Sequence, residues 1–143
     1  MQIQQLSVFI ENKPGRLAEI TEVLAGAEID IRAISVADTS DFGILRVIVD
    51  RPQDAVDALK AHGMTVSLTN VIAVGIPDVS GSFAKVVRLL SDKGFDLEYM
   101  YAFISRDKGK AFVIIRVDQG QQAAEALKAD GWEILTQDVL SHM

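Results

Sequence analysis

Hydrophobic residues in the first half of the chain follow a strand-like pattern in some segments and helical spacing in others. These segments predict six secondary-structure elements. Runs of β-branched and aromatic residues predict four strands, at 6–10, 29–36, 42–50 and 64–68. Helical spacing after Gly15 predicts a helix whose apolar side holds Leu17, Ile20, Val23 and Leu24. A second helix is predicted from Pro52, because the first helical position needs no N–H. The resulting order is βαββαβ.

The second half of the chain repeats this order, with its first and last strands predicted at 71–76 and 132–137. Gly81 placed over Gly15 aligns GSFAKVVRLLSDKGFD with GRLAEITEVLAGAEID, an offset of 81 − 15 = 66 residues. Asp118 placed over Asp50 aligns two ALKA segments, an offset of 118 − 50 = 68 residues. We assign the two extra residues to a predicted hairpin at 105–110, because surface loops tolerate length changes. The chain is therefore a tandem repeat, with expected domains at 1–69 and 70–143.

A βαββαβ unit closes as a four-stranded antiparallel sheet with both helices on one face. The predicted fold class is α+β, with two tandem ferredoxin-like repeats. The second strand of each copy (29–36 and 95–104) is terminal in this order, and exposed sheet edges favour pairing. We expect the repeats to pair side by side through these strands into an extended antiparallel sheet with the helices on one face.

Two predicted strands, FGILRVIVD and KAFVIIRV, are apolar on both alternating faces. A half-exposed antiparallel strand would alternate apolar and polar residues. The sheet face away from the helices is therefore expected to be covered, by the sister repeat or by another copy of the chain. We expect a homodimer.

Composition narrows the functional classes. The chain has 143 residues, 49% hydrophobic residues and a net charge of −6, which is typical of a globular protein without the basic surface of a nucleic-acid-binding domain. RNA-recognition domains share the predicted topology, but the central strands here lack their stacking aromatics. Cysteines are absent, which excludes disulfides and thiolate metal sites. With no signal-peptide pattern at MQIQQLSVF and no apolar span of membrane length, the expected location is the cytoplasm, and no membrane partner is expected.

The segment ENKPGRL (11–17) is a turn that leads into the first helix. The first N–H groups of a helix lack intrahelical partners, and the helix dipole adds partial positive charge there. A carboxylate is a natural ligand for such a position. Gly15 lets the backbone approach a ligand closely, and Pro14 stiffens the turn. The same residues are also good ordinary turn formers, and Asp30 could serve only as a local cap.

NKPGRLA (12–18), placed between a strand and a helix, and IDI (29–31), entering the next strand, resemble the ACT domain. This family consists of small-molecule-sensing regulatory modules of amino-acid metabolism, and the resemblance extends over both copies. It implies an amino-acid ligand held by a loop and by the strand entrance of a neighbouring repeat. The implied site residues of the first loop and of the two strand entrances are Asn12, Lys13, Pro14, Gly15, Arg16, Leu17, Asp30, Ile31, Asp96 and Leu97. Backbone N–H groups of 15–17 would hold the ligand carboxylate, and a nearby carboxylate or amide its ammonium.

The second copy of the turn, DVSGSFA (78–84), departs from the pattern. It keeps Gly81 but carries Asp78 in place of Asn12, Ser80 in place of Pro14 and Phe83 in place of Leu17. Asp78 would repel a ligand carboxylate, so this loop is expected to bind more weakly or to take a different ligand. Ser80 and Ser82 offer hydroxyl donors, although both are also ordinary N-cap residues.

Catalysis finds little support in the sequence. His62 and His142 are the only histidines, and they lie far apart along the chain, so neither a metal cluster nor a catalytic triad is predicted. An aromatic stripe (Tyr99, Tyr101 and Phe103) is expected to pack in a core or an interface, with a ligand pocket as the alternative. No enzyme activity, cofactor, metal or nucleic-acid partner is expected.

The function expected is an amino-acid-binding regulatory protein whose ligand changes how repeats or subunits pair, with an enzyme of amino-acid metabolism as a possible partner. The alternative is a protein–protein interaction module or regulatory subunit, similar to the small subunit of acetolactate synthase, with a vestigial ligand site. A thermal-shift screen with the twenty amino acids separates the two, because a native-state ligand raises the melting temperature.

Overall fold

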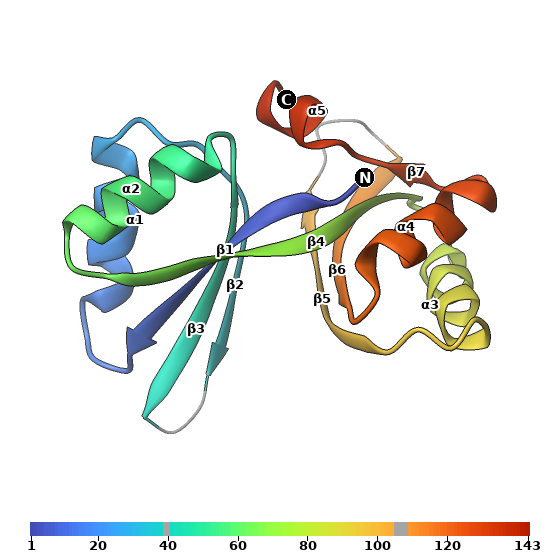
Figure 1. The fold of residues 1–143 in the computed structure, drawn as a ribbon, viewed down its shortest axis with the longest axis horizontal. Coiled ribbons are helices and arrows are strands. Elements are labelled where there is room, and N and C mark those ends of the chain that lie inside the picture. Colours follow the sequence, from blue (N-terminus) through green and yellow to red (C-terminus); the bar gives the residue numbers. More distant parts are fainter. Residues whose placement is uncertain (39–40, 105–108) are drawn as a thin grey trace. The chain divides into compact units, whose positions relative to one another are not determined.

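Both halves of the chain contain the predicted elements in the predicted order (Figure 1). The structure is a computed structural model that describes residues 1–38, 41–104 and 109–143. The first βαββαβ order consists of β1 (Ile3–Glu11), α1 (Arg16–Gly26), β2 (Ile31–Asp38), β3 (Phe42–Val49), α2 (Pro52–Ala61) and the start of β4 (Thr65–Pro77). The second continues with the rest of β4, α3 (Ser82–Asp92), β5 (Leu97–Ile104), β6 (Lys110–Val117), α4 (Gly120–Ala129) and β7 (Glu133–Ile134), and is followed by α5 (Gln137–Ser141).

The described residues separate into two compact units. The first repeat unit comprises Gln4–Thr69 and His142, and the second comprises Met1–Ile3, Asn70–Ser141 and Met143. The boundary falls inside β4, between Thr69 and Asn70. Residues 105–108 of the hairpin to which the two extra residues were assigned lie outside the described residues.

Each unit has the strand order of a ferredoxin-like sheet. In the first unit the order is β4-β1-β3-β2, with antiparallel registers that pair Leu6 with Val47 and Val36 with Leu45. In the second unit β6 lies between β4 and β5, both antiparallel to it, and β7 pairs with the other side of β4. Strands β2 and β5 are the terminal strands of their sheets, as predicted. Pairing between repeats through these strands stays a prediction.

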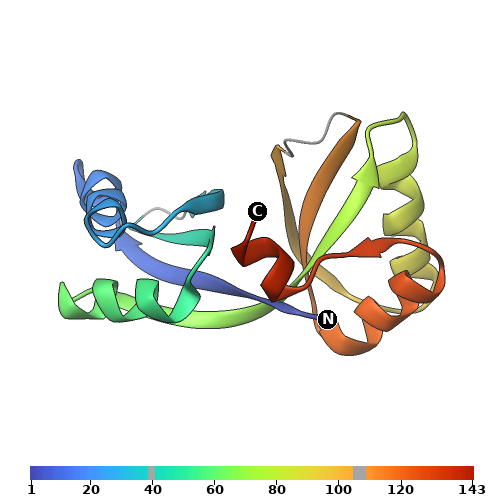
Figure 2. The same cartoon turned by 90° about the horizontal axis from the view of Figure 1, so that it is seen from above.

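Both helices of each unit cover one face of its sheet. Figure 1 shows α1 and α2 side by side on the first sheet, and Figure 2 shows α3 and α4 on the second. In the first unit the helices bury Ile20, Leu24 and Leu59 against alternate strand residues such as Val8 and Val47. The second unit repeats this core, with Leu90 at the position equivalent to Leu24. The helical spacing therefore predicted the buried Ile20 and Leu24 correctly, whereas Val23 is partly buried and Leu17 is 41% exposed.

The sheet face away from the helices is buried only in part, because Phe9 and Phe42 on this face of the first unit are 55% and 58% exposed. Ile48 lies between the core residues Val47 and Val49, so it points to the opposite face, and it is fully buried. In β6, Phe112 and Ile114 alternate with the core residues Val113 and Ile115, and they are buried as well.

Strand β4 corrects the prediction of two separate strands at 64–68 and 71–76. It is one strand of 13 residues that runs through Thr69 and Asn70. The segment contains no proline or glycine until Gly75, and β-branched residues on both sides of Asn70 favour extended backbone. The repeats are therefore joined by a strand and not by a turn.

The end of the chain also differs from the prediction of a strand over 132–137. Strand β7 has only two residues, and the short helix α5 follows it. Thr136 starts this helix, because its hydroxyl accepts the N–H of Val139 at 3.3 Å and its carbonyl accepts the N–H of Leu140 at 3.1 Å. Leu140 is fully buried, so the helix is held by an apolar anchor that the strand prediction did not consider.

Candidate functional site

The first loop, residues 12–15 between β1 and α1, is held by backbone hydrogen bonds. The N–H of Asn12 donates to the carbonyl of Asp41 at 3.2 Å, and the N–H of Lys13 donates to that of Glu11 at 2.8 Å. Gly15 then precedes α1 with a φ of 89° and without any side-chain cap. This left-handed conformation explains why glycine is placed at the start of the helix.

The second loop, residues 78–81 between β4 and α3, repeats this geometry. The N–H of Asp78 donates to the carbonyl of Gly109 at 2.7 Å, and the N–H of Val79 donates to that of Pro77 at 2.8 Å. Gly81 also has a φ of 89° and no side-chain cap follows it. Replacement of Pro14 by Ser80 thus leaves the backbone of the loop intact, and the two loops differ in their side chains. The interpretation of Ser82 as an N-cap is wrong, because Gly81 occupies that position.

Helices α1 and α3, which follow the two loops, both begin with backbone N–H groups that can donate to a ligand. The N–H of Arg16 donates to the carbonyl of Lys13 at 3.3 Å. The next two amides, those of Leu17 and Ala18, donate no hydrogen bond among the described residues. In the second unit the N–H of Ser82 likewise donates to the carbonyl of Val79. The N–H groups of Phe83 and Ala84 donate no hydrogen bond within the described part of the chain. Each helix can therefore hold an anion with its second and third amides, and in α1 these overlap the predicted 15–17 at Leu17.

Charged side chains surround the first loop. The ammonium of Lys13 lies 2.9 Å from the carboxylate of Glu11, and the guanidinium of Arg16 pairs with Glu19 at 3.2 Å. The hydrogen bond and charge of Lys13, together with the charge of Arg16, lower the pKa of Glu11 below that of an ordinary glutamate. Lys13 and Arg16 are cations beside the open amides, although each already has a carboxylate partner.

Asn12 is positioned by two residues that the sequence analysis did not single out. Its side-chain amide donates to the carboxylate of Asp38, at the end of β2. Gly43 lies beneath it, because a Cβ at this position would come within 3.3 Å of Oδ1 of Asn12. A hollow of about 320 Å³ adjoins this arrangement and is lined by Glu11, Asn12, Lys13, Asp41 and Phe42. The only sequence signal for Asp38 and Gly43 was their place on either side of the predicted β2–β3 turn.

Asp30 and Asp96 precede the terminal strands and have matching backbone contacts. The N–H of Asp30 donates to the carboxylate of Asp50 at 3.0 Å, and the N–H of Asp96 donates to that of Asp118 at 3.3 Å. Asp50 and Asp118 therefore hold the strand entrances, a role that the sequence analysis missed. The side chains of Asp30 and Asp96 stay exposed, with Asp30 3.6 Å from Arg32.

Within the first unit, the loop and the strand entrance lie at opposite ends of the sheet. Glu11 pairs with Phe42 at the start of β3, whereas Ile31 pairs with Val49 at its end. Asn12 and Asp30 of the first unit therefore do not line one pocket within that unit.

Apolar side chains at both loops are exposed. Leu17 and Phe83 follow the two glycines, and they are 41% and 44% exposed. Ile31, at the entrance of β2, is also exposed, whereas Leu97 packs against the core of the second unit. These side chains could contact the apolar part of a ligand or a neighbouring repeat.

Among the described residues there is no cluster of three or more His, Cys, Asp and Glu side chains that could hold a metal ion. No helix within the described residues has the length and apolar character needed to cross a membrane.

Comparison with known proteins gives a consistent result. The model of the ACT domain pair family matches residues 1–143. The crystal structure of protein BT0572 from Bacteroides thetaiotaomicron matches with 41% identity and a TM-score of 0.93, covering 100% of this chain and 98% of that one. Among curated proteins, no match was found.

A more distant likeness concerns the fold alone. The ligand-free regulatory subunit of aspartate kinase from Thermus thermophilus has 19% identity and a TM-score of 0.64, over 90% of this chain and 92% of that one. The corresponding subunit from Thermus flavus has 20% identity and a TM-score of 0.61, over 88% and 90% of the two chains.

Proposed function

The chain belongs to the family of ACT domain pairs, and from this premise we propose that it is a regulatory protein that binds a free amino acid at its glycine-containing loops. One observation carries the proposal. The chain has two loops of matching backbone geometry, and each presents two open amides at a helix N-terminus. An α-carboxylate fits this arrangement, because N–H groups and the helix dipole both favour an anion.

The first loop is the proposed primary site. Asn12 offers an amide there, and Lys13 and Arg16 add positive charge. The second loop carries Asp78 at the position of Asn12, which opposes a carboxylate. Its identical backbone supports the same mode of binding, so we propose that it binds the same class of ligand more weakly.

The ligand ammonium needs a carboxylate or amide partner. We propose that the strand entrance of a neighbouring repeat, of the Asp96-Leu97 or Asp30-Ile31 type, supplies it. Because such a site would be completed by two repeats, a bound amino acid would stabilise one pairing of repeats or subunits over another. That difference is the proposed signal to an enzyme of amino-acid metabolism, and we propose the cytoplasm as its location.

A thermal-shift screen with the twenty amino acids finds the ligand, and calorimetry with the best of them tests the site. Ala18→Pro removes one open N–H in the first turn of α1, where proline is tolerated. Loss of a charge-assisted hydrogen bond weakens binding by roughly tenfold or more. The matched control is Ala84→Pro, at the equivalent position of α3 (18 + 66 = 84).

Circular dichroism of both variants checks that the helices remain. A folded Ala18→Pro variant with unchanged affinity would show that the ligand does not use these amides. Loss of binding only in Ala84→Pro would move the primary site to the second loop.

A second candidate function is an interaction module that pairs through its sheet edge. The terminal strand β2 exposes Ile34 and Val36 at 45% and 49%, beside the half-exposed Ile31. An apolar edge of this kind favours association with another chain. We propose that the protein is a homodimer, and light scattering in the absence of ligand tests this. A dimer together with no response in the thermal-shift screen would favour the interaction module over the sensor.

A further inference from the structure

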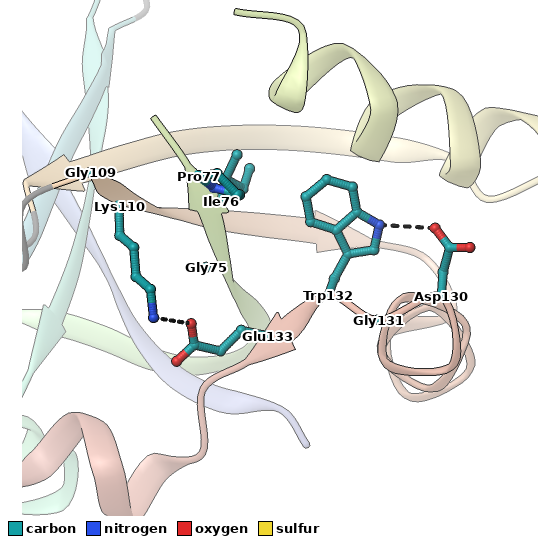
Figure 3. Close-up of a pocket in the computed structure, with 9 residues that line it drawn as sticks. All are labelled: Gly75, Ile76, Pro77, Gly109, Lys110, Asp130, Gly131, Trp132 and Glu133. Carbon is teal, nitrogen blue, oxygen red and sulfur yellow. Dashed lines mark hydrogen bonds and ion pairs between the residues drawn. The ribbon is translucent and has the colours of Figure 1, made fainter. Parts of the chain in front are cut away.

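The second repeat unit contains a pocket whose lining residues do not include those of the second loop or the open amides of α3. Its volume is about 500 Å³, which is within the usual range for small-molecule sites. The pocket adjoins β4 where the two-residue strand β7 begins, and its walls include Gly75, Pro77, Lys110, Trp132 and Glu133 (Figure 3).

The equivalent region of the first unit has different side chains. Gly75 corresponds to Phe9 (75 − 9 = 66), and Lys110 and Glu133 correspond to Phe42 and Thr65 (110 − 42 = 68 and 133 − 65 = 68). The registers agree, since Glu11 pairs with Phe42 in β3 and Pro77 pairs with Lys110 in β6. The second unit has therefore exchanged two phenylalanines and a threonine for a glycine and a pair of opposite charges.

Gly75 is required here for space and not for backbone conformation. It is not among the glycines with positive φ. A Cβ at this position would come within 2.7 Å of Oε2 of Glu133 and 3.1 Å of Cε1 of Phe112. The missing side chain leaves room over β4, and the carboxylate of Glu133 lies beside this space.

The polar groups of the pocket are held in place by hydrogen bonds to one another, and they can still form further hydrogen bonds to a ligand. The ammonium of Lys110 donates to Oε2 of Glu133 at 3.2 Å, and both side chains are about half exposed. A carboxylate has a second oxygen and an ammonium has three donors, so each can take a further partner. The indole N–H of Trp132 donates to the carboxylate of Asp130 at 3.1 Å, which orients the ring. In Figure 3 the ion pair and the indole lie on either side of Gly75.

We propose that this pocket is a second binding site, for a zwitterionic amino acid with an apolar side chain. Lys110 binds the ligand carboxylate and Glu133 binds its ammonium. The ligand side chain passes over Gly75 and contacts the indole of Trp132 and the ring of Pro77. This site goes beyond the loop site proposed above, because it uses none of the open helix amides and is built from one repeat unit.

Trp132 is the only tryptophan of the chain, so its fluorescence reports on this pocket. The full-length protein is titrated with L-leucine, and the emission of Trp132 is followed. Two analogues that each lack one charge, 4-methylpentanoate and 3-methylbutan-1-amine, are titrated in parallel. We expect a saturable change with L-leucine and at least tenfold weaker binding of each analogue, because each loses a charge-assisted hydrogen bond.

Lys110→Met and Glu133→Gln should each weaken the L-leucine response at least tenfold. Gly75→Ala should weaken it by displacing Glu133, and Gly26→Ala, which meets no atom within 4 Å, is the matched control. Lys110 and Glu133 are half exposed, so their variants test the site even if Gly75→Ala fails to fold.

Ala18→Pro should leave the emission response unchanged, which separates this site from the loop site. Absence of a saturable response to L-leucine overturns the proposal. So does equal binding of the amine analogue, which would make the pocket a site for organic cations. A response that persists unchanged in both Lys110→Met and Glu133→Gln also overturns it.

Discussion

Gly15 and Gly81 lie 66 residues apart (81 − 15) and share one backbone conformation, with a φ of 89° at each. Each residue is followed directly by a helix whose second and third amides are open among the described residues. The turn chemistry of the two loops differs, yet the glycine and the geometry persist. A duplicated left-handed glycine is thus the structural basis of both proposed loop sites.

Substitution of either glycine should destabilise its unit. No atom lies within 4 Å of an added Cβ at Gly15 or Gly81, so the cost comes from the left-handed backbone and not from a collision. Gly15→Ala and Gly81→Ala should each lower the free energy of unfolding by roughly 1–2 kcal/mol in urea denaturation. Gly26→Ala, inside a helix and in open space, should be neutral or stabilising. A Gly15→Ala variant as stable as the unmodified protein would contradict this explanation.

The Gly15→Val variant should lose amino-acid binding while retaining its fold. The space around Gly15 is open, so the loss would follow from a rearranged turn that moves the amides of Leu17 and Ala18. Calorimetry with the ligand found by the thermal-shift screen measures the affinity. Unchanged affinity in the folded variant would place the ligand elsewhere.

Asn12 and Asp38 should be energetically coupled, because the amide of Asn12 donates to the carboxylate of Asp38. In a double-mutant cycle of Asn12→Ala and Asp38→Ala, we expect a coupling of about 0.5–1.5 kcal/mol in the free energy of unfolding. Gly43→Ala should reduce the coupling, since the added Cβ comes within 3.3 Å of Oδ1 of Asn12. Strictly additive effects would show that this hydrogen bond contributes nothing in solution.

Substitutions of Asp30 and Asp50 should have different effects on stability, although a hydrogen bond joins the two residues. The N–H of Asp30, and not its side chain, donates to the carboxylate of Asp50. Asp50→Ala should therefore cost about 1–2 kcal/mol of stability by leaving this N–H without its acceptor. Asp30→Ala should change stability by less than about 0.5 kcal/mol and weaken ligand binding. Similar losses of stability in both variants would contradict these roles.

The ion pair of Glu11 and Lys13 should be visible in a pH titration. Lys13 and Arg16 lower the pKa of Glu11, so the carboxylate is favoured in the folded protein relative to the unfolded chain. Its contribution to stability is present at neutral pH and is lost as the pH falls through this lowered pKa. Nuclear magnetic resonance should show Glu11 titrating below the usual glutamate range, and Lys13→Gln should raise its pKa. A pKa that does not respond to Lys13→Gln would exclude the pair.

Much of the fold could be predicted from the pattern of residues. The repeat offset, the element order and the buried positions Ile20, Leu24 and Leu90 follow from local spacing, which the folded chain preserves. The interpretation failed where two local choices were nearly equal. Residues 69–70 suit either a turn or a strand, and pairing decided for the continuous strand β4.

The candidate loops could also be located from the sequence, because NKPGRLA and the repeated glycine mark them. The polar residues that position these loops could not be located from the sequence. Asp38 approaches Asn12, and Asp50 holds the N–H of Asp30, only because antiparallel pairing of β3 with both β1 and β2 brings the strand ends together.

The amino-acid pattern alone predicts a duplicated βαββαβ protein with glycine turns before two helices, because hydrophobic periodicity and glycine conformation are local properties. The folded chain adds which amides stay open, which carboxylates position the loops, and that Gly75, Lys110 and Glu133 line one pocket with Trp132. These residues are up to 58 positions apart (133 − 75), and their proximity depends on the register of β4 with β6 and β7. Register is a cooperative result of packing across the sheet, and no short segment encodes it.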